Sequence, residues 1–69
     1  MGNLYFIRSN GEKMLVETNI EEKYVMKSII AFVKETNPNF SMYYTRSWKT
    51  EEGTMYDVGS HSEFFLLTK

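Results

Sequence analysis

The chain has 69 residues, a formal net charge of −1, no cysteine, one histidine and a high share of aromatic residues, with five Tyr, five Phe and one Trp. This composition leaves room for a single domain over residues 1–69, and it excludes disulfides and cysteine-based metal sites. Lys and Arg are interspersed with Asp and Glu, so duplex nucleic acid is not expected as a partner. No apolar run approaches the roughly 20 residues that span a bilayer, so we expect a cytoplasmic protein without a membrane segment and without a cofactor.

The N-terminal part predicts a β-hairpin. Residues 3–8 and 14–16 are short apolar runs, and the polar residues 9–12 separate them. Asn10-Gly11 is the dipeptide that most readily supplies two residues at positive φ, which a two-residue turn requires. A tight turn is therefore predicted at Asn10-Gly11.

The segment 19–36 predicts an amphipathic helix. Its apolar residues recur at helical spacing, and those on one side are Val25, Met26, Ile29, Ile30, Phe32 and Val33. Asn19 and Glu22 have the spacing of a capping box, and Asn37-Pro38 provides a stop signal. The helix is thus expected to begin just after Asn19 and to end near Thr36.

The remainder predicts strands. Residues 40–49 alternate with period two, and 54–58 can return antiparallel after the turn at Glu51-Glu52-Gly53. The run Phe64 to Leu67 is apolar at every position, which is typical of a strand that is covered on both faces. The predicted fold class is α+β, with the order β-β-α-β-β and room for a fifth short strand. The helix is expected to cover one face of an antiparallel four- to five-stranded sheet.

The second face of this sheet is then left without cover. One helix can bury only one of the two alternating pairs in the last strand, either Phe64 and Leu66 or Phe65 and Leu67. The other pair needs a partner protomer, a different protein or a flat ligand. A homodimer is the expected solution for a chain of this length.

Two groups of polar and aromatic residues are candidates for function. Tyr44, Arg46 and Trp48 share one side of their strand and can stack a base or bind an anionic ligand, although cross-strand packing is the alternative. Asp57 and His61 lie near Ser60 and Ser62, the residue types of hydrolytic triads, in what is also a plausible loop. A metal site here would have one nitrogen ligand, so none is expected.

The stretch Tyr56-Asp57-Val58-Gly59-Ser60-His61-Ser62-Glu63-Phe64-Phe65 resembles the C-terminal segment of short uncharacterised proteins encoded by phages and prophages of Gram-positive bacteria. The resemblance covers about the last fifteen residues. It implies a small accessory protein that acts by binding and inhibiting a host or defence protein, in the cytoplasm of the host cell. Five residues carry it: Asp57, Gly59, Ser60, Phe64 and Phe65.

The sequence therefore predicts a non-enzymatic binding module that works as a homo-oligomer. Two alternatives remain open: a binder of a nucleotide-like ligand or single-stranded nucleic acid, and a small hydrolase that uses His61. The candidate binding residues are Tyr44, Arg46, Trp48, Tyr56, Asp57, His61 and Phe65.

Overall fold

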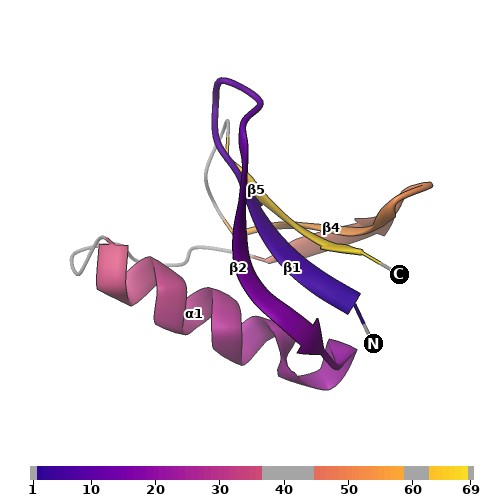
Figure 1. The fold of residues 1–69 in the computed structure, drawn as a ribbon, viewed down its shortest axis with the longest axis horizontal. Helices are drawn as coiled ribbons and strands as arrows, with labels where there is room; N and C mark the ends of the chain where they lie inside the picture. Colours follow the sequence, from indigo (N-terminus) through magenta and orange to yellow (C-terminus); the bar gives the residue numbers. More distant parts are fainter. Residues whose placement is uncertain (1, 37–44, 59–62, 69) are drawn as a thin grey trace.

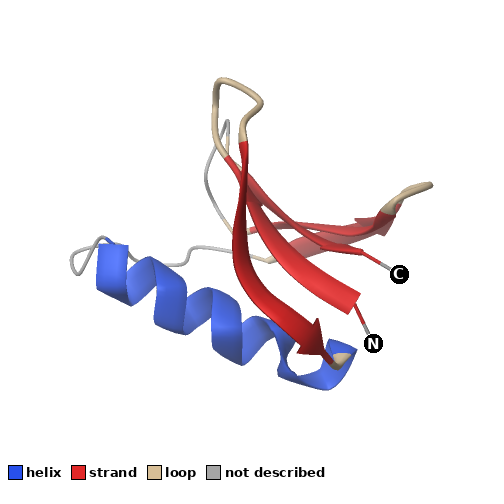
Figure 2. Cartoon of the chain, in the orientation of Figure 1, coloured by secondary structure: helices blue, strands red, loops and turns tan. Residues whose placement is uncertain are grey.

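The protein is a five-stranded antiparallel sheet with one helix on one face (Figures 1 and 2). The computed structural model describes residues 2–36, 45–58 and 63–68. In chain order the elements are β1 (Gly2–Ile7), β2 (Lys13–Ile20), a 3-10 turn η1 (Glu22–Tyr24), α1 (Val25–Thr36), β3 (Arg46–Lys49), β4 (Gly53–Asp57) and β5 (Phe64–Thr68). The predicted α+β class is confirmed, and the sheet has five strands.

The strand order is β2-β1-β5-β4-β3, so β2 and β3 form the two edges of the sheet. In the chain, α1 follows β2 and precedes β3. It begins near the end of β2 and runs along one face of the sheet (Figure 1). The strands β1 and β5 are neighbours near the middle of the sheet. Asn3 N donates to Thr68 Oγ1 at 2.9 Å, which joins the two ends of the chain.

The core lies between the sheet and α1. Val25 and Ile29 of the helix are fully buried. Phe32 lies 5.1 Å from Phe6 and 5.7 Å from Phe65 between ring centroids, and the rings of Phe6 and Phe65 are 5.1 Å apart. Tilted and edge-on ring pairs of this kind add about 0.5–1.5 kcal/mol each to the burial term. The helix is therefore held on the sheet by the apolar side that its sequence predicts.

The predicted hairpin between β1 and β2 is confirmed, but its two-residue turn is wrong. Gly11 N donates to Arg8 O at 2.9 Å, and Arg8 N donates to Glu12 O at 2.8 Å, so the loop is longer. Gly11 has φ 89°, in the left-handed region. Asn10 does not, because Asn19 is the only described non-glycine residue with positive φ. Asn10 contributes through its side chain, whose Oδ1 accepts from Glu12 N at 2.9 Å. The result is a three-residue loop with a glycine bulge.

The predicted start of the helix at Asn19 is also wrong. Asn19 belongs to β2, where it has φ 55° and its N donates to Asn3 Oδ1 at 3.2 Å. Pairing between β1 and β2 shifts register near this residue, so Asn19 serves as a bulge that an Asn side chain tolerates. The helical segment begins at Glu22, and Glu21 at the N-cap position makes no side-chain cap bond. Strand pairing, rather than a capping box, thus sets the boundary.

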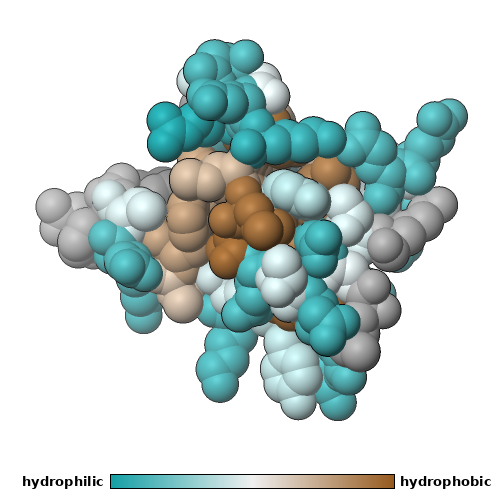
Figure 3. All heavy atoms as spheres, viewed as in Figure 1, coloured by the Kyte–Doolittle hydropathy of each residue, from teal (hydrophilic) through white to brown (hydrophobic). Residues whose placement is uncertain are grey.

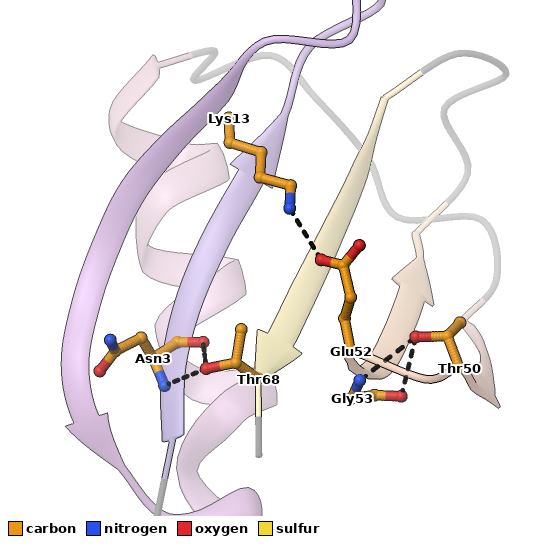
Figure 4. Close-up of polar contacts among 6 residues, drawn as sticks. All are labelled: Asn3, Lys13, Thr50, Glu52, Gly53 and Thr68. Atoms are coloured by element: carbon orange, nitrogen blue, oxygen red, sulfur yellow. Dashed lines mark hydrogen bonds and ion pairs between the residues drawn. The ribbon is translucent and has the colours of Figure 1, made fainter.

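The third and fourth strands form the second hairpin. The predicted strand 40–49 is described only from residue 45 onward, and β3 covers Arg46–Lys49; residues 40–44 lie outside the described part. The predicted antiparallel return is confirmed as β4. Thr50 closes the turn, because its Oγ1 accepts from Gly53 N at 3.2 Å and donates to Gly53 O at 3.1 Å (Figure 4).

Candidate functional site

The face of the sheet opposite α1, here called the open face, carries one apolar residue from every strand. Leu15 pairs with Tyr5, Tyr5 with Leu66, Leu66 with Met55, and Met55 with Trp48. Directly paired residues lie on the same face, so these five side chains form one continuous row across the sheet. We call Leu15, Tyr5, Leu66, Met55 and Trp48 the apolar row.

The ends of the apolar row are its most exposed members. Leu15 is 51% exposed and Trp48 is 42% exposed, whereas Leu66 at the centre is 2% exposed. Among the described residues, the one other exposed large hydrophobic side chain is Tyr24, which belongs to η1. Figure 3 shows hydrophobic residues gathered over β2 and bordered by hydrophilic side chains. Two of the three exposed large apolar residues therefore belong to one row.

A second set of side chains extends the apolar surface beside this row. Phe64 and Ile7 are paired across β5 and β1, and both are half-buried. The Phe64 ring meets the Trp48 ring edge-on, with 6.0 Å between centroids and 80° between planes. This contact links β5 to β3 over the intervening β4, so it fixes the position of the exposed indole.

An ion pair lies at one corner of the open face. Arg46 and Asp57 are cross-strand partners, and Arg46 Nη2 donates to Asp57 Oδ2 at 2.8 Å. The Asp57 side chain is 3% exposed and the Arg46 side chain is 66% exposed. A buried carboxylate requires a compensating charge, and the guanidinium supplies it. Asp57 therefore acts as an anchor that orients Arg46 along the rim.

A second ion pair crosses the open face diagonally. Lys13 begins β2, beside the end of β1, whereas Glu52 directly precedes β4, whose start lies beside the end of β5. Their charged groups meet at 2.7 Å, in front of β1 and β5 (Figure 4). On the strand spacing alone, three strand intervals separate them laterally by about 14 Å. Both side chains must therefore extend over the sheet to meet.

The structure divides the sequence-predicted site residues into three groups. Arg46, Trp48 and Asp57 lie together at the β3 side of the open face. Tyr56 and Phe65 face α1 and belong to the core, at 7% and 2% exposure. The other two predicted residues, Tyr44 and His61, lie outside the described residues.

The hydroxyl of Tyr56, on the face of the sheet that α1 covers, has a raised pKa. Burial raises the pKa of Tyr56 above its ordinary value of 10.0, and the negative charge of Glu22 raises it further. The phenol therefore stays neutral at physiological pH. Its position supports the fold rather than a binding surface.

Three members of the apolar row were not named as site residues by sequence reasoning: Tyr5, Leu15 and Met55. Phe64 and Leu66 were one of the two pairs of which one was expected to need a partner, and the structure places this pair on the open face. The alternation in each strand indicates which residues share a face within that strand. It does not indicate how strands are ordered or aligned, and the apolar row exists only through that alignment.

The described residues contain no group of three or more His, Asp or Glu side chains that could hold a metal ion. The proposed hydrolytic residues Ser60, His61 and Ser62 fall outside them. Within the same part of the chain, no helix has the length and apolar character to cross a membrane.

Two hollows lie away from the candidate residues. One, of about 210 Å³, is lined by Glu22, Lys49 and residues at the ends of β1, β4 and β5. The other, of about 600 Å³, lies between β2 and α1 beside Tyr24 and Lys27. Neither is lined by Arg46 or Trp48. The aromatic and arginine side chains thus lie on an open surface rather than in these hollows.

Comparison of the chain with family models, curated proteins and solved structures finds no match.

Proposed function

We propose that this protein is a small non-enzymatic binding module that works as a homo-oligomer and uses the open face to bind protein. One observation carries the proposal: the apolar row extends over all five strands and is most exposed at its two ends. Exposed apolar side chains bordered by charged groups are typical of protein interaction sites. The resemblance to phage accessory proteins suggests a host or defence protein as the target of inhibition.

The residue types of the apolar row suit a protein interface. Trp, Tyr and Met are enriched in the buried centres of such interfaces, where Trp and Tyr also supply much of the binding energy. Trp48 is held edge-on by Phe64 before any partner arrives, so little side-chain freedom is lost on binding.

The alternative, a nucleotide-like ligand, has less support. An anion would need the Arg46 guanidinium, which already neutralises the buried Asp57 carboxylate. Binding a phosphate there would place a second anion beside the Asp57 carboxylate and compete for the same guanidinium. Thermal-shift measurements with mono-, di- and cyclic nucleotides test the alternative, and we expect no stabilisation.

The proposal is tested by comparing two exposed aromatic residues in different places. Trp48→Glu places a charge on the open face, and Tyr24→Glu places one beside α1, where the side chain is 51% exposed. Each protein is immobilised and exposed to a lysate of a Gram-positive bacterium, and captured proteins are quantified by mass spectrometry. We expect a protein that the wild type and Tyr24→Glu retain and that Trp48→Glu loses.

Circular dichroism checks that all three proteins are folded. Identical capture by the two variants and the wild type, with all three folded, would show that the open face does not bind the target.

A further inference from the structure

We infer that the open face binds a second copy of this chain, face to face, in a two-fold symmetric dimer. The inference rests on the proposed function, because it names the second copy as a protein that the open face binds. A different target protein must displace that copy, since the dimer uses nearly the whole open face.

The size of the open face matches a partner as small as the chain itself. The Cα atoms extend over 31 × 22 × 20 Å, so no face is larger than the first two of these dimensions allow. A stable interface of standard size buries about 800 Å² on each partner. An interface of that size uses nearly the whole open face, including its charged corners. The occupant must therefore be complementary to the charges as well as to the apolar row.

Among the described residues the charges of the open face are balanced, which favours a copy of itself. Lys13 and Arg46 are matched by Glu52 and Asp57, and each cation already has an anion partner. A strongly acidic or basic partner would gain nothing from such a surface. A second copy presents the same two cations and two anions, so every charge has an opposite one available in the partner.

One direction of the two-fold axis pairs the charges of Lys13 and Glu52 between the two copies and leaves the Arg46–Asp57 pair within each chain. The axis lies between the two faces and runs from the Arg46–Asp57 corner toward the C-terminal end of β2. Because this axis exchanges the start of β2 with the start of β4, it places Lys13 over the partner's Glu52. It also exchanges the middle of β3 with the start of β5, so Trp48 lies over the partner's Phe64. The two sheets then cross at about 90°, one of the two known ways of packing sheets.

The same pairs that meet within one chain thus meet between chains. Lys13 with Glu52 and Trp48 with Phe64 are intrachain contacts in the monomer. In the dimer Lys13 and Glu52 each exchange their partner for the identical residue of the second copy, whereas Trp48 keeps its contact with Phe64 and adds the partner's Phe64. Lys13 and Glu52 are 46% and 61% exposed, so they can swing from one partner to the other without disturbing the core. Closing the dimer therefore gives the apolar rows a partner and loses no ion pair.

The decisive experiment reverses the charges of the diagonal pair. Lys13→Glu and Glu52→Lys are made separately and in combination, and dimerisation is measured by sedimentation velocity with native mass spectrometry. In either single variant both interchain contacts join like charges, so we expect the dissociation constant to rise at least about tenfold. Mixing the two single variants makes both contacts attractive, and we expect a heterodimer as stable as the wild-type dimer. The double variant restores opposite charges and dimerises alone.

A matched control uses the ion pair between Lys23 and Glu21, which lies outside the open face at 3.6 Å. Lys23→Glu is expected to leave dimerisation unchanged.

The inference is overturned if the wild type is monomeric, or if both single variants dimerise like the wild type. These failures are distinct from a failure of the proposed function. If the wild type is a monomer and Trp48→Glu still loses a target protein, binding of a target by the open face is supported and only the dimer is ruled out. If the dimer weakens on charge reversal but no captured protein depends on Trp48, the dimer is supported and binding of a different target by the open face is ruled out.

Discussion

Phe64 and Phe65 are neighbours in β5, yet they lie in different environments. Phe65 is 2% exposed and contacts the rings of Phe6 and Phe32 beneath α1. Phe64 is half-buried on the open face and its ring contact is with Trp48. Because successive side chains of a strand point to opposite faces, the same residue type serves the core at one position and the open face at the next. The two faces are similar in composition and differ in what covers them.

The largest expected difference between the two faces is in the response of Phe64 and Phe65 to replacement by alanine. Phe65→Ala removes the ring that joins β5 to α1, and we expect it to lower the free energy of unfolding by about 3–5 kcal/mol. That is comparable to the whole stability of so small a domain, so the variant should be largely unfolded. Phe64→Ala should lower it by only about 1 kcal/mol and leave a folded protein that self-associates less well.

Thermal and urea unfolding followed by circular dichroism measure the first effect, and sedimentation measures the second. The comparison fails if both variants unfold alike, or if both remain folded and assembled like the wild type.

A charged residue of the open face also contributes to the fold. Arg46→Met removes the guanidinium that pairs with the buried Asp57 carboxylate, and we expect a loss of about 1–2 kcal/mol. Lys49→Met is the matched control on the same strand: Lys49 is exposed and lies 4.0 Å from its acidic partner Glu22, so its loss should stay within about 0.5 kcal/mol. Urea unfolding at neutral pH measures both. Equal losses would mean that the Arg46–Asp57 pair has no special role.

The loop between β1 and β2 keeps the apolar row in register. Gly11 has φ 89°, and a Cβ there has open space around it, so Gly11→Ala is strained by conformation alone. We expect a loss of about 1 kcal/mol, and a smaller loss for Gly11→Asn, because Asn tolerates this conformation better.

A shift by one residue would exchange the faces of β2 and remove Leu15 from the row. Amide hydrogen exchange in β2 reports such a shift. Protection that is unchanged in both variants, with no loss of stability, would show that the glycine does not set the register.

The smallest effect concerns Tyr56 on the covered face. The pKa of Tyr56 is raised in the folded protein, first by burial and then by the charge of Glu22. Above about pH 10 the unfolded chain releases this proton while the folded chain still holds it, so stability falls as pH rises beyond that value. Below that pH the group is neutral in both states and contributes no pH dependence.

Tyr56→Phe should therefore change stability little at neutral pH and reduce its fall at alkaline pH. Urea unfolding between neutral and alkaline pH tests this, and parallel curves for variant and wild type would contradict it.

Much of the fold could be predicted because it depends on local patterns. The apolar side of α1 and the hairpin at Asn10-Gly11 follow from periodicity and turn chemistry, and the apolar run in β5 indicates a strand with two covered faces. The start of the helix could not be predicted. Asn19 fits an N-cap in sequence, but pairing between β1 and β2 extends through it and uses its tolerance of positive φ instead.

The candidate site was predictable only along single strands. Arg46 and Trp48 share a face because they are two residues apart in β3, and Asp57 joins them as the cross-strand partner of Arg46. Tyr56 and Phe65 are equally aromatic, but their place in the core depends on which face α1 covers. That choice is made by packing across the whole sheet, which no short stretch of sequence contains.

The position of β5 also determines the order in which the fold can form during synthesis. It follows the other four strands in the chain, yet it lies between β1 and β4 in the sheet. The two hairpins can each form early, but they cannot join until β5 is made. Its pairing with β1 includes a bond between residues 65 positions apart, the kind of distant contact that slows folding. A nascent chain therefore carries β1 with one edge unpaired until β5 is made, and during that time it is most exposed to aggregation and to chaperones.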